Sequence, residues 1–120
     1  MKGILKVVPL DSVNEGMAVC YELEIGYYVG GKVSKLNYRN TPKFIPIATY
    51  DNCSASILIS ELKNIVCEYT YKDGTIQQVP LSEEDYGVAI DKIGTEVDFE
   101  MCVANSASGS VYPLRKCKLL

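Results

Sequence analysis

The stretch at residues 17–38, MAVCYELEIGYYVGGKVSKLNY, decides the fold that the sequence predicts. Apolar or aromatic side chains occupy alternate positions at Val19, Tyr21, Leu23, Ile25, Tyr27 and Val29. This period of two is typical of a β-strand with one buried face. The Gly30-Gly31 pair supplies the positive-φ positions of a type I′ turn, so we expect residues 32–38 to return as a second strand. The register of this hairpin predicts that Tyr28 and Lys35 point away from the core.

Length and composition predict one globular domain covering residues 1–120. Of the 120 residues, 48% are hydrophobic and 22% are charged, which suits a single core and is unlike a disordered chain. The first apolar run, residues 4–10, is interrupted by Lys6 and is too short for a signal peptide or a membrane span. The five cysteines form no C-x-x-C pair, and histidine is absent. We therefore expect a cytoplasmic protein with reduced thiols, no metal, no cofactor and no membrane association.

Strand and turn patterns continue on both sides of this hairpin. Pro46 and Pro113 indicate edge strands or bulges, because proline cannot donate a hydrogen bond within a sheet. Asp73-Gly74 predicts the turn of a second hairpin. We expect strands at residues 2–8, 44–50, 65–71, 75–79, 96–103 and 111–119.

Helical spacing occurs twice. Apolar residues at positions 55, 58, 59 and 62 predict a helix over residues 54–64, although the alternation of Ile57 and Ile59 would also suit a strand. A second helix begins at Ser82, and Gly94 suits its left-handed C-terminal cap. The predicted fold class is mainly β, or β-rich α+β. It is a small barrel or curved antiparallel sheet with one or two short helices.

The C-terminal part resembles the terminal hairpin of cold-shock and related OB-fold proteins. Residues 94–100, GTEVDFE, precede a polar loop and a closing strand that ends in Lys118-Leu119-Leu120. Those domains typically read glycine, a V-x-F-x strand, a polar loop, and a strand ending in a basic and two apolar residues. The order strand, hairpin, helix, hairpin also resembles the OB topology, in which the helix lies between the third and fourth strands. The resemblance implies an OB-like barrel, similar to compact single-stranded DNA-binding proteins of the phage kind.

Basic and aromatic residues gather in two segments that contain no acids. Between Glu24 and Asp51, and again after Glu100, every charged residue is Lys or Arg. Single-stranded nucleic acid requires this combination, because cations neutralise phosphates and aromatic rings stack on bases. We therefore expect a non-catalytic protein that binds single-stranded DNA or RNA through a basic, tyrosine-rich β surface. Its expected residues are Tyr27, Tyr28, Lys32, Lys35, Tyr38, Arg39, Lys43, Tyr112, Arg115 and Lys116.

The same residues also suit roles that involve no nucleic acid. Tyrosine suits half-buried strands and a charge run is usually a solvated face, so the pattern can be purely structural. A small accessory or inhibitor protein would instead bind a protein partner through an edge strand or through its acidic face at residues 83–100. Edge pairing would also permit a homodimer. An enzyme is not expected, because the chain lacks histidine, a nucleophile signature and a glycine-rich phosphate loop.

Overall fold

The computed structural model describes residues 1–10, 12–36, 43–104 and 114–120, and the chain is mainly β, as the sequence predicts. The strands are β1 Lys2–Pro9, β2 Ala18–Glu24, β3 Tyr27–Val33, β4 Phe44–Thr49, β5 Ser54–Leu58, β6 Lys63–Thr70, β7 Ile76–Pro80, β8 Glu96–Ala104 and β9 Leu114–Leu119. The helical segments are the 3-10 turns η1 Ile59–Glu61, η2 Glu83–Asp85 and η3 Ile90–Lys92, and the helix α1 Tyr86–Ala89.

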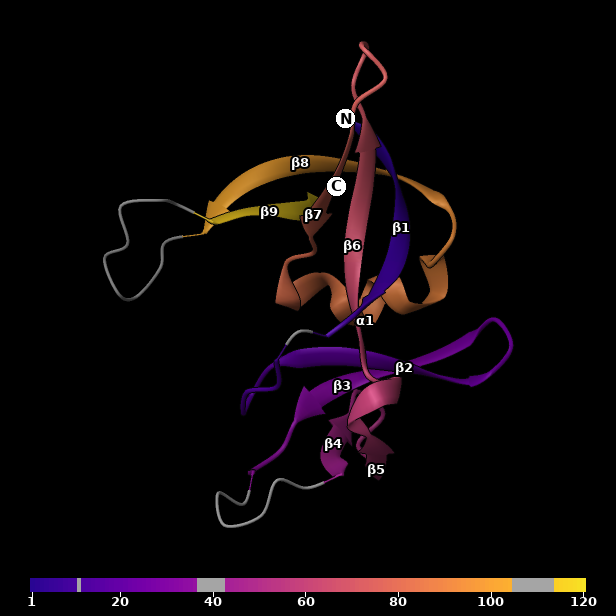
Figure 1. The fold of residues 1–120 in the computed structure, drawn as a ribbon, viewed down its shortest axis with the longest axis vertical. Helices are drawn as coiled ribbons and strands as arrows, with labels where there is room; N and C mark the ends of the chain where they lie inside the picture. The colour runs from indigo at the N-terminus through magenta and orange to yellow at the C-terminus, as the bar shows by residue number, and fades with distance from the viewer. Residues whose placement is uncertain (11, 37–42, 105–113) are drawn as a thin grey trace.

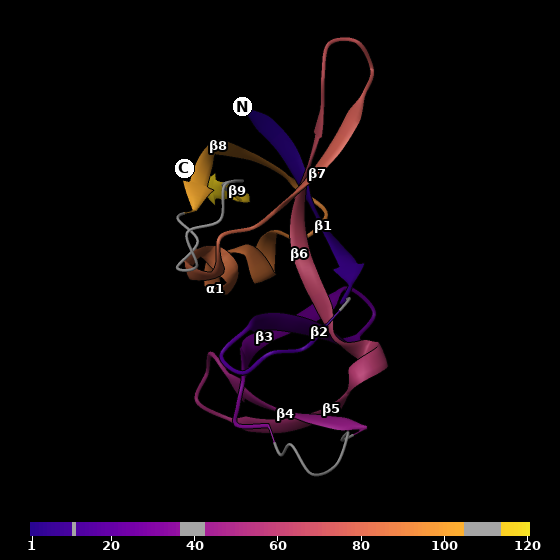
Figure 2. The same ribbon diagram turned by 60° about the vertical axis from the view of Figure 1, so that its left-hand side comes forward.

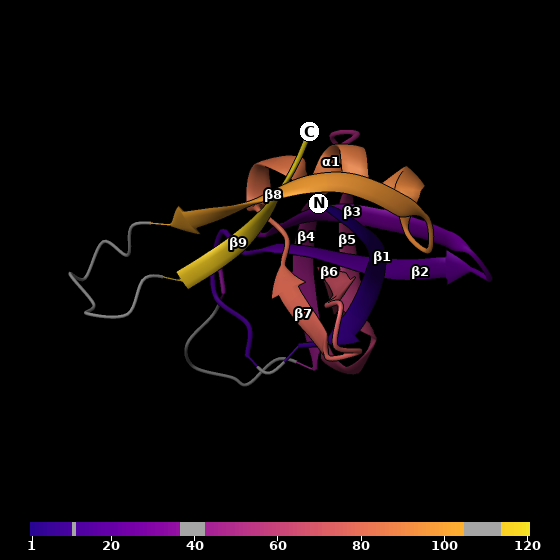
Figure 3. The same cartoon turned by 90° about the horizontal axis from the view of Figure 1, so that it is seen from above.

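Strands β7, β6, β1, β8 and β9 form a barrel in the upper half of Figure 1. Their order is β7-β6-β1-β8-β9, and each neighbouring pair is antiparallel. The two ends of this order meet just after β7, where Leu81 forms a parallel bridge with Cys117. There the Ser82 amide also donates a hydrogen bond of 2.8 Å to the Cys117 carbonyl oxygen. In the strand order β1 lies between β6 and β8, and Figure 3 shows β8 from above as it arches past β1 with β9 beside it.

The barrel core is centred on Phe99, which is fully buried. The segment η2–α1–η3 lies below the barrel and above β3, where it covers one end of this core (Figure 2). Tyr86 on α1 is buried there, and its hydroxyl accepts a hydrogen bond of 3.2 Å from the Ile65 amide. The barrel core consists of Leu5, Ala18, Cys20, Ile65, Cys67, Val79, Leu81, Tyr86, Ala89, Phe99 and Cys117.

Strands β2 to β5 form a second sheet region, with the order β5-β4-β3-β2, in the lower half of Figure 1. This β2–β5 sheet is inserted in the sequence between barrel strands β1 and β6. Its core consists of Val19, Tyr21, Val33, Ile45, Ile47 and Leu62. Strand β2 contributes to both cores, because successive side chains of a strand point to opposite faces.

A β-hairpin forms within the predicted stretch, but both its turn and its arms differ from the prediction. The return arm is β3, which ends at Val33, and the described residues 34–36 of the predicted return strand are not in a strand. Gly30 and Gly31 lie inside β3, where they pair with Cys20 and Val19 of β2. The chain instead reverses at Ile25-Gly26, where Gly26 has a φ of 81°. A Cβ atom on Gly31 would lie 2.4 Å from the Ala48 carbonyl oxygen, so glycine here allows two strands to approach closely.

The predicted helix over residues 54–64 is also wrong. These residues form β5, the short turn η1 and the start of β6, so the alternative strand interpretation is confirmed for residues 54–58. Strand β5 pairs with β4 from Phe44↔Leu58 to Ala48↔Ser54. This pairing satisfies the backbone hydrogen-bonding groups that a helix would have satisfied internally.

The expected edge at Pro46 is not observed. Strand β4 lies between β3 and β5, although its pairing with β3 ends at Val33↔Ile47, just before Pro46. The Pro46 carbonyl oxygen still accepts a hydrogen bond of 2.9 Å from the Ser34 amide, which needs no proline N–H. Pro113 lies outside the described residues.

Other local predictions are confirmed. Asp73-Gly74 forms the turn of the β6–β7 hairpin, with Gly74 at a φ of 88°. Gly94 follows the helical segment with a φ of 85°. Strand β8 alternates as expected, with Phe99 buried between the exposed carboxylates of Asp98 and Glu100.

Candidate functional site

The structure brings together one basic residue from each of the two acid-free segments. Lys32 on β3 and Lys116 on β9 line the same hollow, together with Ser82, Glu83 and Glu84. Lys116 lies on the outer face of β9, because the next residue, Cys117, points into the barrel core. We call this feature the lysine hollow. Strand pairing had to be known before these residues, which are far apart in the sequence, could be placed side by side.

The lysine hollow is not purely basic. Glu83 and Glu84, which begin the helical segment, bring two carboxylates beside the two ammonium groups. A similar approach occurs beyond β3, where the Glu15 carboxylate accepts a hydrogen bond of 2.8 Å from the Leu36 amide. Acids from other parts of the chain therefore approach described residues of both acid-free segments.

Two of the predicted tyrosines, Tyr27 and Tyr28, line a second hollow between β3 and the helical segment. This tyrosine hollow is lined by Tyr27, Tyr28, Val29, Gly30, Tyr50, Asp51, Gly87, Ile90 and Asp91. Gly30 forms part of it because Ile90 and Tyr50 pack directly above its backbone, within 3.0 Å of where a Cβ atom would lie. The hollow measures about 150 Å³, which is room for one small group.

Tyr28 is more enclosed than the sequence predicts. It pairs with Glu22 across β2 and β3, so the register predicted from a turn at Gly30-Gly31 is wrong. Its side chain is half-buried and packs against the barrel core. Burial raises the pKa of Tyr28, and a hydrogen bond that its hydroxyl donates to Glu22 raises it further. Tyr28 also lines another hollow, together with Glu22, Glu61 and Lys63.

The remaining predicted site residues are less closely associated. Lys35 follows β3 and Lys43 precedes β4, and both side chains are exposed. Arg115 is exposed on β9 next to Lys116. The predicted residues Tyr38, Arg39 and Tyr112 lie outside the described residues.

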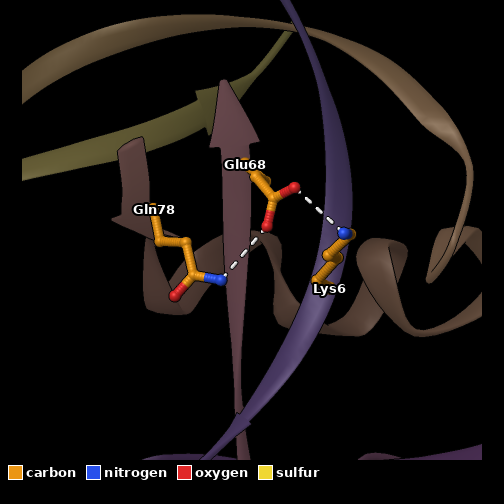
Figure 4. A network of polar contacts seen from close by, with 3 residues as sticks. All are labelled: Lys6, Glu68 and Gln78. Carbon is orange, nitrogen blue, oxygen red and sulfur yellow. Dashed lines mark hydrogen bonds and ion pairs between the residues drawn. The ribbon is translucent and has the colours of Figure 1, made fainter. Parts of the chain in front are cut away.

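The outer face of the β1–β6–β7 sheet carries a polar network of its own (Figure 4). The Glu68 carboxylate accepts a hydrogen bond of 2.9 Å from the Lys6 ammonium and one of 3.2 Å from the Gln78 amide. The hydrogen bond from Lys6 is the main reason that the pKa of Glu68 is lowered. Lys6 is thus already paired, so this face offers a phosphate group little free positive charge.

Sequence reasoning did not include Tyr50, Asp51 or Asp91 in the site. Tyr50 was visible as an aromatic residue of the first acid-free segment. Asp51 and Asp91 carried no signal, because they meet only when the β4–β5 turn and η3 pack on β3. A charge pattern along one segment cannot reveal which other segments fold against it.

Among the described residues, no group of three or more Cys, Asp or Glu side chains could hold a metal ion. The cysteines are free thiols, and Cys20, Cys67 and Cys117 are buried. Burial raises the pKa of Cys20 to about 12, so this thiol stays protonated at neutral pH. Burial also raises the pKa values of Cys67 and Cys117.

In the part of the chain that the structure describes, no helix has the length and apolar character needed to cross a bilayer. No protein-family model matches the chain, and no curated protein or solved structure resembles it at a significant level. Any functional conclusion therefore depends on the geometry of the two hollows.

Proposed function

We propose that this protein binds single-stranded nucleic acid along the side where β3 approaches β9. The observation that carries this proposal is the lysine hollow, in which Lys32 and Lys116 can contact the same stretch of phosphates. Arg115 is exposed on the same strand, but successive side chains of a strand alternate, so it lies on the face of β9 opposite to Lys116 and does not line this hollow. The role is binding, without catalysis.

The strand order gives independent support. With the β2–β5 sheet set aside as an insertion, the barrel strands in sequence order are β1, β6, β7, β8 and β9. The helical segment then falls between the third and fourth strands, as it does in OB-fold proteins. The sequence placed that helix at residues 54–64, and it is the segment starting after Ser82 that occupies this position. Many OB-fold domains bind oligonucleotides beside the loop that joins their first two strands, the place occupied here by the β2–β5 sheet.

Tyr27 and Tyr28 contribute less to this proposal than the lysines do. Tyr28 and Lys32 lie on one face of β3, four residues or ~13 Å apart. The carboxylates of Glu22, Asp51 and Asp91 line the hollows beside these tyrosines and would repel phosphates. We therefore centre the nucleic-acid surface on the lysine hollow, which neither tyrosine lines.

The proposal is tested by fluorescence anisotropy with labelled oligo-dT at two ionic strengths. We expect binding that weakens as salt rises, because lysines release counterions from the phosphates. The double change Lys32→Glu and Lys116→Glu should weaken binding at least ~tenfold and flatten the salt dependence. The matched control for each of the two single changes is Lys72→Glu, which alters the charge by the same amount in the distant β6–β7 turn.

Glu83 and Glu84 sharpen the same experiment. Replacing both by glutamine removes negative charge from the lysine hollow without changing side-chain size, so oligo-dT should bind more tightly. Absence of oligo-dT binding at low salt, or equal weakening by Lys72→Glu, would contradict the proposed site.

A protein partner is the second candidate function, and strand β5 favours it. Within the described part of the chain β5 pairs only with β4, and its sequence SASIL carries neither charge nor proline. Edge strands without such protection readily accept a further strand. Light scattering after size-exclusion chromatography tests whether a second copy is the partner, and Ile57→Lys on this strand should then abolish the dimer.

A further inference from the structure

The tyrosine hollow has a chemistry different from that of the lysine hollow. Its wall combines three aromatic rings, Tyr27, Tyr28 and Tyr50, with the carboxylates of Asp51 and Asp91. No basic side chain is present among the described residues that line it. Lys92, the nearest cation in sequence to Asp91, lines a separate hollow beside β8 and the C-terminus.

The ionisation states of these groups favour a cation. A hydrogen bond from the Thr49 hydroxyl is the main reason that the pKa of Asp51 is lowered, so its carboxylate stays charged. Burial, followed by the nearby Glu83 and Cys20, raises the pKa of Tyr50, so its phenol stays neutral with an electron-rich face. Neutral aromatic faces beside carboxylates attract organic cations and repel phosphates.

Four separate parts of the chain build the hollow. Tyr27 to Gly30 come from β3, Tyr50 and Asp51 from the β4–β5 turn, Gly87 from α1, and Ile90 and Asp91 from η3. Gly30 and Gly87 have no side chains that would fill the hollow, and Tyr27 is 60% exposed at its rim. A volume of about 150 Å³ admits one flat side-chain group but not a folded loop.

We propose that the tyrosine hollow binds a guanidinium group, as carried by an arginine side chain of a partner protein. A guanidinium is planar, stacks on tyrosine faces and forms paired hydrogen bonds with carboxylates, whereas an ammonium is a compact point charge. The exposed ring of Tyr27 at the rim would contact the aliphatic part of the arginine. This inference does not rest on nucleic-acid binding, because it uses a separate hollow of opposite charge.

The test is an NMR titration of the full chain, following the backbone amides of Gly30 and Gly87. The peptide acetyl-Ala-Arg-Ala-amide should shift these signals in a saturable way. The same peptide with citrulline, which has the same shape without the charge, should not. Methylguanidinium should bind more weakly than the arginine peptide, because it lacks the aliphatic stem that contacts the rim.

Three variants locate the binding. Asp51→Asn with Asp91→Asn should weaken the arginine peptide about tenfold or more, and Tyr27→Ser should weaken it through loss of an exposed ring. Asp98→Asn, which removes a carboxylate from β8, is the matched control and should leave affinity unchanged. The proposal is overturned if the same peptide with citrulline or lysine in place of arginine binds as tightly. It is also overturned if methylguanidinium binds as tightly as the arginine peptide, or if the Asp51→Asn, Asp91→Asn variant binds the arginine peptide normally.

Discussion

The barrel and the β2–β5 sheet are built in opposite ways. The barrel core joins residues from Leu5 to Cys117, so nearly the whole chain must be in place before it closes. The core of the β2–β5 sheet spans only residues 19–62, and its strands follow one another as hairpins. The contrast teaches that a locally encoded sheet can be inserted into a barrel whose own contacts are distant in sequence.

The two regions meet at few points, and the candidate sites lie there. Strand β2 joins β6 through the single pair Cys20↔Lys63, and Ile90 of η3 packs on Gly30 of β3. The tyrosine hollow lies at this second contact, and the lysine hollow lies between β3 and β9. Each hollow is therefore lined by residues from both regions, and each lies outside the two hydrophobic cores.

Truncating one core residue in each region should give the largest effects and separate their roles. Phe99→Ala should lower the free energy of unfolding by about 3 to 5 kcal/mol, because it leaves a cavity in the fully buried barrel core. Ile47→Ala should cost about 2 to 4 kcal/mol, by the same mechanism in the other core. Urea denaturation measures both losses, and hydrogen exchange shows where each variant opens.

The pattern of exchange tests the comparison itself. We expect Phe99→Ala to accelerate the slowest amides of both regions, since β2 is held by the barrel core through Ala18 and Cys20. Ile47→Ala should accelerate exchange mainly in β3 to β5. Val88→Ala, at a 58% exposed position, should change stability by less than ~0.5 kcal/mol. If Ile47→Ala opened the barrel equally, the two regions would form one cooperative unit.

The adjacent glycines of β3 should give an intermediate and unequal effect. A Cβ atom at Gly31 would meet the backbone of β4, 2.4 Å from the Ala48 carbonyl oxygen, so Gly31→Ala should cost about 2 to 3 kcal/mol. At Gly30 the same atom would meet the flexible end of Ile90, 2.8 Å away, so Gly30→Ala should cost less than ~1 kcal/mol. Thermal unfolding compares the two variants, and equal losses would mean that β4 gives way as readily as Ile90.

These glycines also show where the sequence misleads. Gly30-Gly31 has the composition of a hairpin turn, but whether a glycine provides positive φ or close packing depends on the strand beside it, which no local pattern reveals. The chain turns at Gly26 instead, so the faces predicted for Leu23 and Ile25 were wrong, and both side chains are exposed. Val19 and Tyr21 were correctly predicted to be buried.

Local signals were dependable where no distant partner was needed. The Asp73-Gly74 turn, the cap at Gly94 and the alternation around Phe99 all depend on neighbours in sequence, and all were predicted. Residues 54–58 satisfied both helical and strand periods, and the pairing with β4 decided between them. For the site, the sequence supplied Lys32 and Lys116 but could not supply their proximity or the carboxylates between them.

An effect smaller than those of the core changes and of Gly31→Ala concerns the hydroxyl that holds the helical segment to β6. Tyr86→Phe should cost about 1 kcal/mol at pH 8, because the buried Ile65 amide loses its acceptor. Burial raises the pKa of Tyr86 to about 12, so between pH 10 and 12 the unfolded chain releases the phenolic proton while the folded protein retains it. The contribution of Tyr86 to the free energy of unfolding therefore falls as pH rises through this range, by ~1.4 kcal/mol per pH unit.

Tyr86→Phe has no phenolic proton to release, so the difference in the free energy of unfolding between this variant and the wild type should disappear by pH 11. Cys20, with a pKa raised to about 12, destabilises both proteins alike in alkali and cancels from the difference. Tyr71→Phe is the control, because Tyr71 is exposed and should show no convergence. Urea denaturation at pH 8 and pH 11 measures the free energy of unfolding of both proteins. If the difference between them stayed constant, the Tyr86 phenol would be hydrated in the folded protein. The helical segment would then cover the barrel core less tightly than its buried contacts require.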